Sequence, residues 1–182
     1  VAWRDHREAT SQIYAKQYRE FKASTDWRLS SPGNARRPAV AVSRAESPLA
    51  STRLTNSNSS FPMTAVTWES RRYQTDPADI WVAEILINQD LKLYQISDNS
   101  AESVSPQIDL SSDQTWLFWR DGSSGNWEIY FSQHQRNQWS NNRSFLPKDH
   151  VASLNKSGHN PTFPIVSISQ DQVHFVWIES AG

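Results

Sequence analysis

Residues 115–140 read TWLFWRDGSSGNWEIYFSQHQRNQWS, and this stretch decides the fold. It begins with an apolar run that ends at Trp119, continues through a polar turn at residues 121–126, and ends in a second apolar run at residues 127–131. Two short β-prone runs joined by a turn rich in Gly, Ser, Asn and Asp are typical of a β-hairpin. The stretch therefore predicts an antiparallel hairpin and the start of a further strand. Degenerate copies of it occupy residues 1–16 and 65–83.

The apolar strand that ends in tryptophan recurs along the whole chain. Its tryptophans are Trp3, Trp68, Trp119 and Trp177. An acidic residue follows each of them closely, namely Asp5, Glu69, Asp121 and Glu179. The first three copies continue into a second apolar pair, which is Ile13-Tyr14, Ile80-Trp81 or Ile129-Tyr130. Self-similarity of this kind is the signature of a repeat architecture, in which each unit buries its faces against its neighbours.

Two further strands complete each repeat unit. A proline near the start of a short apolar strand recurs at Pro38, Pro106 and Pro161, where its missing N–H costs least. Another strand is predicted at residues 27–29, 91–96 and 138–140. Apolar positions alternate as in strands, and residues 44–60, RAESPLASTRLTNSNSS, show no period and are predicted to form a surface loop insertion.

The predicted fold class is all-β: a partial β-propeller of about three four-stranded antiparallel blades plus the start of a fourth. We expect one propeller fragment spanning residues 1–182, with repeat units at 1–60, 61–112, 113–172 and a truncated 173–182. Propellers typically contain about four to eight blades. The sequence therefore predicts that additional chain or a partner covers the open edges near Val1 and Trp177.

The repeat resembles the blades of sialidase-like propellers with Asp-box (BNR) repeats. The pattern V-x-W-x-D, a polar turn, E-I-Y-x-S, a later Trp and S-x-x-P-x-I carries this resemblance. The box S-x-D-x-G-x-x-W falls on residues 132–139, where Ser132 and Trp139 are kept, while His134 and Arg136 replace the Asp and the Gly. In such a box the Asp and the hydroxyl group shape a turn at the outer edge of a blade.

The resemblance implies a test for catalysis. Sialidases are known for an arginine triad, a Tyr nucleophile with a Glu partner, and an Asp acid/base. This chain lacks the Arg-Ile-Pro segment that marks the first arginine of the triad in that family. Tyr14 and Tyr130 belong to the repeat itself, and a packing residue recurs in every unit whereas a catalytic group occurs once. We therefore predict no catalytic residue in this sequence.

Composition and the remaining polar motifs exclude several classes of function. The formal net charge of −1 provides no field for nucleic acid, and the lack of cysteine excludes disulfides and thiolate metal sites. No apolar run approaches a membrane span, and no signal peptide is visible. The pairs Arg36-Arg37 and Arg71-Arg72 could hold a carboxylate or sulfate but are interpreted as solvated surface.

Other polar residues are interpreted as structural or coincidental. They are the histidines His6, His134, His150, His159 and His174, the sequon asparagines Asn58, Asn142 and Asn155, the loop acids Asp109, Asp113, Asp121 and Asp171, and the Asp149-His150 pair. They lack the spacing of a metal site, a Ca²⁺ loop or a nucleophile elbow. No cofactor or metal is therefore expected, and the residues that would bind a ligand are left unknown.

The sequence favours a non-catalytic β-propeller binding or scaffold module in an extracellular or periplasmic location. We expect a protein or glycan partner, no nucleic acid, no membrane span within this chain and membership of a larger complex as an option. Two alternatives stay open. One is part of a sialidase-like glycoside hydrolase whose catalytic residues lie outside this fragment, and the other is a structural subunit or ectodomain piece of a larger, membrane-anchored assembly.

Overall fold

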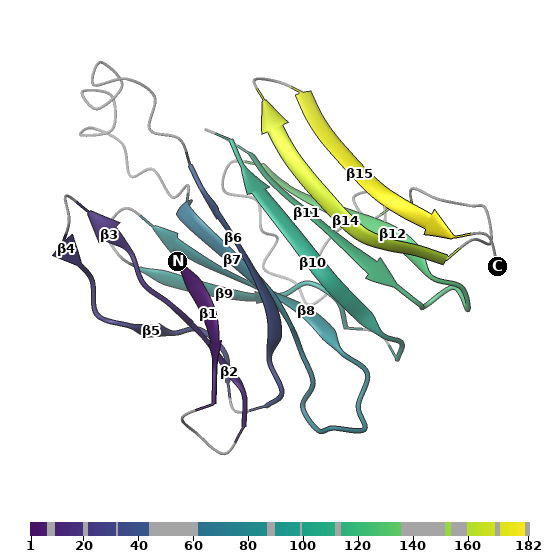
Figure 1. Ribbon diagram of the computed structural model, residues 1–182, viewed down its shortest axis with the longest axis horizontal. Coiled ribbons are helices and arrows are strands. Elements are labelled where there is room, and N and C mark those ends of the chain that lie inside the picture. The colour runs from purple at the N-terminus through teal and green to yellow at the C-terminus, as the bar shows by residue number, and fades with distance from the viewer. Residues whose placement is uncertain are drawn as a thin grey trace.

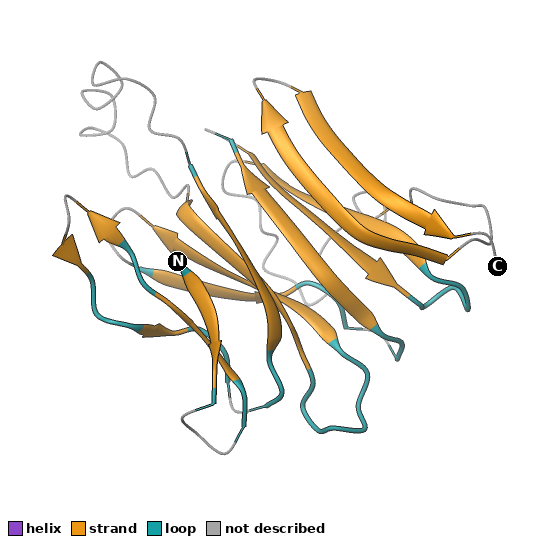
Figure 2. Cartoon of the chain, in the orientation of Figure 1, coloured by secondary structure: helices purple, strands orange, loops and turns teal. Residues whose placement is uncertain are grey.

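The computed structural model describes most of the chain as strands, turns and loops (Figures 1 and 2). The described residues are 1–6, 10–19, 22–31, 33–43, 62–86, 90–98, 100–111, 114–135, 152–153, 160–169 and 172–180. They contain strands and no helix, which confirms the predicted all-β class. The strands form several small antiparallel sheets, and none of the sheets within the described ranges closes on itself. The predicted loop at residues 44–60 lies outside these ranges.

Four sheets follow one another along the chain (Figure 1). The first sheet contains, in spatial order, β1 (Ala2–Asp5), β2 (Gln12–Ala15) and β5 (Trp27–Arg28), and a separate short hairpin contains β3 (Tyr18–Arg19) and β4 (Lys22–Ala23). The second contains β6 (Arg36–Val42), β7 (Pro62–Ser70), β8 (Asp79–Leu86) and β9 (Leu91–Gln95). The third contains β10 (Ser103–Leu110), β11 (Gln114–Asp121), β12 (Glu128–Gln135) and β13 (Ala152–Ser153). The fourth contains β14 (Asn160–Ser169) and β15 (Gln172–Ser180).

The repeat units of the sequence begin with the tryptophan strand, but the last three sheets each begin one strand earlier. Each of the last three sheets starts with the proline-containing strand and continues into the tryptophan strand. The fourth strand of the third sheet is β13, which pairs with Tyr130 and Phe131 on β12. The sequence predicts that strand at residues 138–140, which lie outside the described ranges.

The first strand of each of the last three sheets carries the same irregularity. Its register shifts at Arg37-Pro38, Ser105-Pro106 and Phe163-Pro164. In each pair the residue before proline has a positive φ, of 49°, 58° and 51° respectively. Proline disfavours the right-handed helical region for the preceding residue, and an extra residue in a strand bends it at a bulge. Pro164, rather than Pro161, is thus the structural equivalent of Pro38 and Pro106.

The repeated tryptophans occupy matching places in the register. Trp3 is paired with Tyr14, Trp68 with Trp81, and Trp119 with Tyr130. The ring centroids are 6.0 Å apart in the first of these pairs and 6.1 Å apart in the third. Trp68 and Trp119 are almost fully buried, each within a hydrophobic core between two successive sheets. Aromatic burial between sheets therefore explains why tryptophan recurs at this position.

Backbone hydrogen bonds also link neighbouring sheets. Ala35 N donates to the carbonyl of Ser11 at 3.1 Å, and Ser103 N donates to the carbonyl of Ala78 at 2.8 Å. Each donor lies at or directly before the first residue of a proline-containing strand. Each acceptor lies just before the strand that pairs with the tryptophan strand of the preceding sheet, which is β2 or β8. The same linkage is therefore used between the first and second sheets and between the second and third.

The last two sheets are joined by stacked aromatic rings. Phe118 on β11 lies 5.3 Å from Phe175 on β15, and Phe175 lies 5.5 Å from Trp177, measured between ring centroids. Aromatic pairs at such separations contribute roughly 0.5–1.5 kcal/mol beyond the area that they bury.

Candidate functional site

A groove of about 460 Å³ lies between the first and second sheets. Leu29 and Ser31 line it from the first sheet's side, and all its other lining residues belong to the second sheet or its loops. These loops are the turn between β7 and β8, at residues 71–78, and the segment that follows β9. The volume falls within the roughly 300–1,000 Å³ typical of small-molecule sites.

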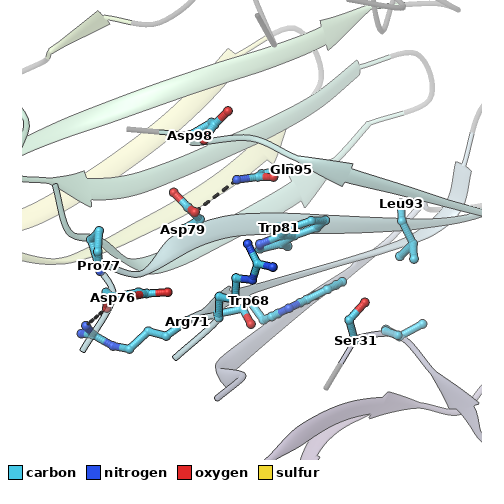
Figure 3. Close-up of a pocket in the computed structure, with 13 residues that line it drawn as sticks. Ser31, Trp68, Arg71, Asp76, Pro77, Asp79, Trp81, Leu93, Gln95 and Asp98 are labelled. Carbon is cyan, nitrogen blue, oxygen red and sulfur yellow. Dashed lines mark hydrogen bonds between the residues drawn. The ribbon is translucent and has the colours of Figure 1, made fainter. Parts of the chain in front are cut away.

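Two tryptophans form the aromatic part of the groove (Figure 3). Trp68 on β7 is only 1% exposed, whereas its cross-strand partner Trp81 on β8 is partly exposed. Leu93 on β9 adds an apolar side chain that is 47% exposed. Trp68 therefore belongs to the core, and Trp81 offers an indole surface to a molecule in the groove.

The turn at residues 71–78 is held in place by Arg71. Its Nη1 donates to the backbone carbonyl of Asp76 at 2.6 Å and lies 2.5 Å from Glu102 Oε1, while its Nη2 donates to Glu102 Oε2 at 2.8 Å. The same Glu102 oxygen accepts from Ala78 N at 3.1 Å. Arg71 is thus committed to the turn. The neighbouring Arg72 is exposed, with its guanidinium 5.6 Å from the centre of the Tyr73 ring.

Polar side chains on the rim are oriented by hydrogen bonds. Asp79 Oδ2 accepts from Gln95 Nε2 at 3.1 Å, and Asp79 Oδ1 accepts from Ser97 Oγ at 3.2 Å (Figure 3 shows the first bond). Asp76 Oδ2 accepts from Tyr73 N at 3.2 Å. These contacts fix the carboxylates before any ligand arrives, and such preorganisation lowers the cost of binding.

The groove coincides with a departure from the repeat. In the first and third sheets the tryptophan donates its indole N–H to the acid two residues later, from Trp3 to Asp5 at 3.2 Å and from Trp119 to Asp121 at 3.1 Å. Asp121 Oδ2 also accepts from Ser103 Oγ at 2.7 Å. In the second sheet the register places Ser70 at the position of Asp121 and Ala35 at the position of Ser103.

The smaller side chain of Ser70 lines the groove where its counterparts hold a carboxylate. The partner of the tryptophan differs as well, since Trp81 stands where the first and third sheets have Tyr14 and Tyr130. Departures from an otherwise consistent pattern are expected at functional sites. The sequence signal for this groove was therefore the lack of an acid two residues after Trp68. It is easily overlooked, because Glu69 directly after Trp68 looks like the acid of the repeat.

Glu69 has a different role from the other acids of the repeat. It is 5% exposed and lies opposite Arg36 in the register, beside the first of the three bulges. Its Oε2 accepts from Ser105 N at 2.9 Å and from Arg37 Nη1 at 3.2 Å. Glu69 therefore links the bulge of β6, at Arg37, with the bulge of β10, at Ser105, and so connects the second and third sheets. Of the two arginine pairs singled out in the sequence, one therefore supports this bridge and the other lies at the groove.

The structure places a buried pair where the Asp box has its acid. His134 on β12 is 3% exposed, and its Nδ1 lies 3.2 Å from Oε1 of Glu84 on β8, which is 1% exposed. Burial, reinforced by the charge of Glu84 and a hydrogen bond with it, raises the pKa of the Tyr94 hydroxyl. The residue that departs from the box thus connects the second and third sheets through a polar contact inside the core. Sequence reasoning missed this pairing.

The remaining sequence candidates in the described part of the chain are Asp109, His6 and His174. Asp109 Oδ2 accepts from Ile168 N at 2.6 Å, which links the third and fourth sheets. His6, directly after β1, and His174 on β15 are both exposed. The other candidates lie outside the described ranges: Asp113, Asp171, His150, His159, the Asp149-His150 pair and the three sequon asparagines.

Among the described residues, no group of three or more His, Asp or Glu side chains could hold a metal ion. In the same ranges, no helix is long and apolar enough to cross a membrane. Comparisons with known protein families, with curated proteins and with solved structures found no match for this chain.

Proposed function

We propose that this chain is part of a sialidase-like β-propeller that acts as a non-catalytic binding module outside the cytoplasm. Three repeated features support the propeller. The bulge recurs at the same place in β6, β10 and β14, the tryptophan pairs share one register, and β10 contacts both β6 and β14. Radial stacking of antiparallel sheets lets each sheet cover the face of the next without long crossovers.

The groove between the first two sheets is the proposed binding site. The observation that carries this proposal is that the groove opens where the second sheet has Ser70 in place of the acid two residues after the tryptophan, and Trp81 in place of the tyrosine opposite it. A residue that serves packing is repeated in every sheet, whereas a residue that serves a ligand is needed once. The second sheet keeps Trp68 for its core and differs from the repeat around it.

Binding rather than catalysis is favoured by the state of the charged side chains. Arg71 is paired with Glu102, and Asp79 is held by Gln95 and Ser97. These contacts stabilise the turn and the strand ends of the second sheet. A general acid or base has to exchange protons with a substrate, whereas these side chains hold the turn and the strand ends in place.

The test uses the purified 182-residue chain on two surfaces, an array of defined oligosaccharides and an array of defined peptides. We expect at least one array to retain the chain, and Trp81→Ala to abolish that retention. Tyr130→Ala is the matched control, because Tyr130 is the equivalent residue of the third sheet and lies away from the groove. The bound molecule should be recovered chemically unchanged when mass spectrometry is applied to the eluate.

Two results would refute the proposal. One is that neither array shows retention that depends on Trp81. The other is that the eluate contains cleavage products of the bound oligosaccharide, which would favour the hydrolase.

A further inference from the structure

We propose that the groove binds a neutral saccharide unit, stacked on Trp81 and hydrogen-bonded by the surrounding polar rim. This inference rests on the proposed binding function and specifies the ligand class of the same groove. It depends on three properties of the described residues: the exposed part of the indole, the balance of charges and the mixture of hydrogen-bond donors and acceptors.

The aromatic surface favours a ligand with an apolar face. Trp81 is partly exposed in the groove, next to the 47% exposed side chain of Leu93. The face of an indole ring carries negative potential, so it attracts the weakly positive C–H groups of a flat molecule. One face of a pyranose ring presents such C–H groups.

The charges of the rim disfavour an anionic ligand. Asp76, Asp79 and Asp98 all line the groove. Arg71 is neutralised by Glu102, so Arg72 is the lining cation that stays exposed. A sulfate or carboxylate group would therefore meet more negative than positive charge. The three carboxylates would attract a cationic ligand, but an ammonium group only donates hydrogen bonds and so offers no acceptor to the guanidinium of Arg72. A hydroxyl group of a neutral ligand can serve both the carboxylates and the guanidinium.

The hydrogen-bonding groups favour hydroxyls. Carboxylates only accept hydrogen bonds, guanidinium groups only donate them, and the carboxamide of Gln95 does both. A hydroxyl group can donate to Asp79 and accept from Gln95 or Arg72, so a polyhydroxylated ring matches every kind of group on this rim. A lipid or steroid would leave these groups without partners, at a cost of roughly 1–3 kcal/mol for each buried one.

The experiment measures binding of three sets of oligosaccharides to the 182-residue chain by isothermal titration calorimetry. The neutral set contains cellobiose, maltose, lactose, mannobiose and xylobiose. The anionic set contains 3′-sialyllactose and a chondroitin sulfate disaccharide, and the cationic set contains chitobiose without acetyl groups. We expect saturable binding of at least one neutral sugar and weaker binding of both charged sets.

Variants locate the binding to the groove. Trp81→Ala should weaken the neutral sugar at least about tenfold, as for truncation of an aromatic anchor. Gln95→Ala should weaken it by about threefold to tenfold, since one hydrogen bond is lost. Because Gln95 is a partly exposed strand-end residue, this variant should keep the fold even if Trp81→Ala does not. Tyr130→Ala is the control that should leave binding unchanged.

Three outcomes overturn the saccharide proposal. They are no binding by any neutral sugar in the set, tighter binding of a charged set, and neutral binding that is insensitive to both Trp81→Ala and Gln95→Ala. Retention on the peptide array that depends on Trp81, with no neutral sugar bound, would refute the saccharide and leave the binding module standing. If no array retains the chain in a Trp81-dependent way and no neutral sugar binds, both proposals are refuted.

Discussion

Trp119 donates its indole N–H to Oδ2 of Asp121, 3.1 Å away on the same strand. Asp121 is 2% exposed and also accepts from Ser103 Oγ at 2.7 Å and from Ser123 N at 2.9 Å. One carboxylate therefore satisfies a core tryptophan, the start of β10 and the turn after β11. Trp3 and Asp5 form the same kind of bond in the first sheet at 3.2 Å, in a less buried setting.

Removing this carboxylate should destabilise the third sheet. Asp121→Ala leaves a buried indole N–H and a buried hydroxyl without their acceptor. Hydrogen bonds to a charged group contribute about 1.5–3 kcal/mol, so we expect the free energy of unfolding to fall by about 3 kcal/mol in urea titrations. Asp5→Ala is the control and should cost about 1 kcal/mol, because Asp5 is only partly buried. Equal losses in the two variants would contradict the assigned role of burial.

The same carboxylate should make stability depend on pH. Burial alone would raise the pKa of Asp121, but hydrogen bonds from Ser103, Ser123 and Trp119 outweigh it and lower the pKa in the folded chain. The folded pKa is therefore below the unfolded value of about 3.9. The contribution is complete above that value and is lost as the pH falls through the folded pKa.

Urea unfolding at pH 6, 4 and 3 measures this dependence. The free energy of unfolding of the wild type should fall more steeply below about pH 4 than that of Asp121→Asn, which cannot titrate at this position. Parallel curves for the two proteins would show that Asp121 does not carry the acid sensitivity.

The contact between Glu84 and His134 predicts strong coupling between the second and third sheets. Both side chains are almost fully buried, and removing one member leaves a buried polar or charged group without its partner. We expect Glu84→Ala and His134→Ala each to cost about 3–5 kcal/mol. The double variant Glu84→Leu with His134→Leu should be less destabilised than either single variant, since apolar residues of similar volume can replace a buried pair. Its remaining cost comes from the Tyr94 hydroxyl, which loses its hydrogen bond with Glu84.

A double-mutant cycle in urea separates this pair from simple packing. Glu84→Leu and His134→Leu, measured singly and together, should give an interaction energy above about 1 kcal/mol. Additive effects within about 0.5 kcal/mol would show that the two side chains act independently.

The sequence predicted the strands better than it predicted their grouping. Alternating apolar residues and the repeated tryptophan marked the strands, because burial against neighbouring sheets requires that pattern. The one-strand offset of the sheets depends on how the proline-containing strands pair. Pro161 and Pro164 are both consistent with a strand start, and only the register shows that Pro164 follows the bulge at Phe163.

The groove was harder to predict for a physical reason. Its lining combines Leu29 from the first sheet's side with Arg72 from a turn and Gln95 from the last strand of the second sheet. Such a combination depends on sheet stacking, which local sequence patterns do not encode. The pair Glu84 and His134 is hidden for the same reason, because its members lie on strands of different sheets.

Restoring the repeat should close the groove. Ser70 occupies the position of Asp5 and Asp121, so Ser70→Asp places a carboxylate two residues after Trp68, where it can accept the indole N–H as in the other sheets. The larger, charged side chain would fill space beside Trp81. We expect binding of the neutral sugar to weaken at least about tenfold, while the circular dichroism spectrum stays unchanged.

Ser70→Ala is the matched control and should keep binding within about threefold, since it adds neither volume nor charge. Unchanged affinity in Ser70→Asp would show that the departure from the repeat at this position is unrelated to the ligand site.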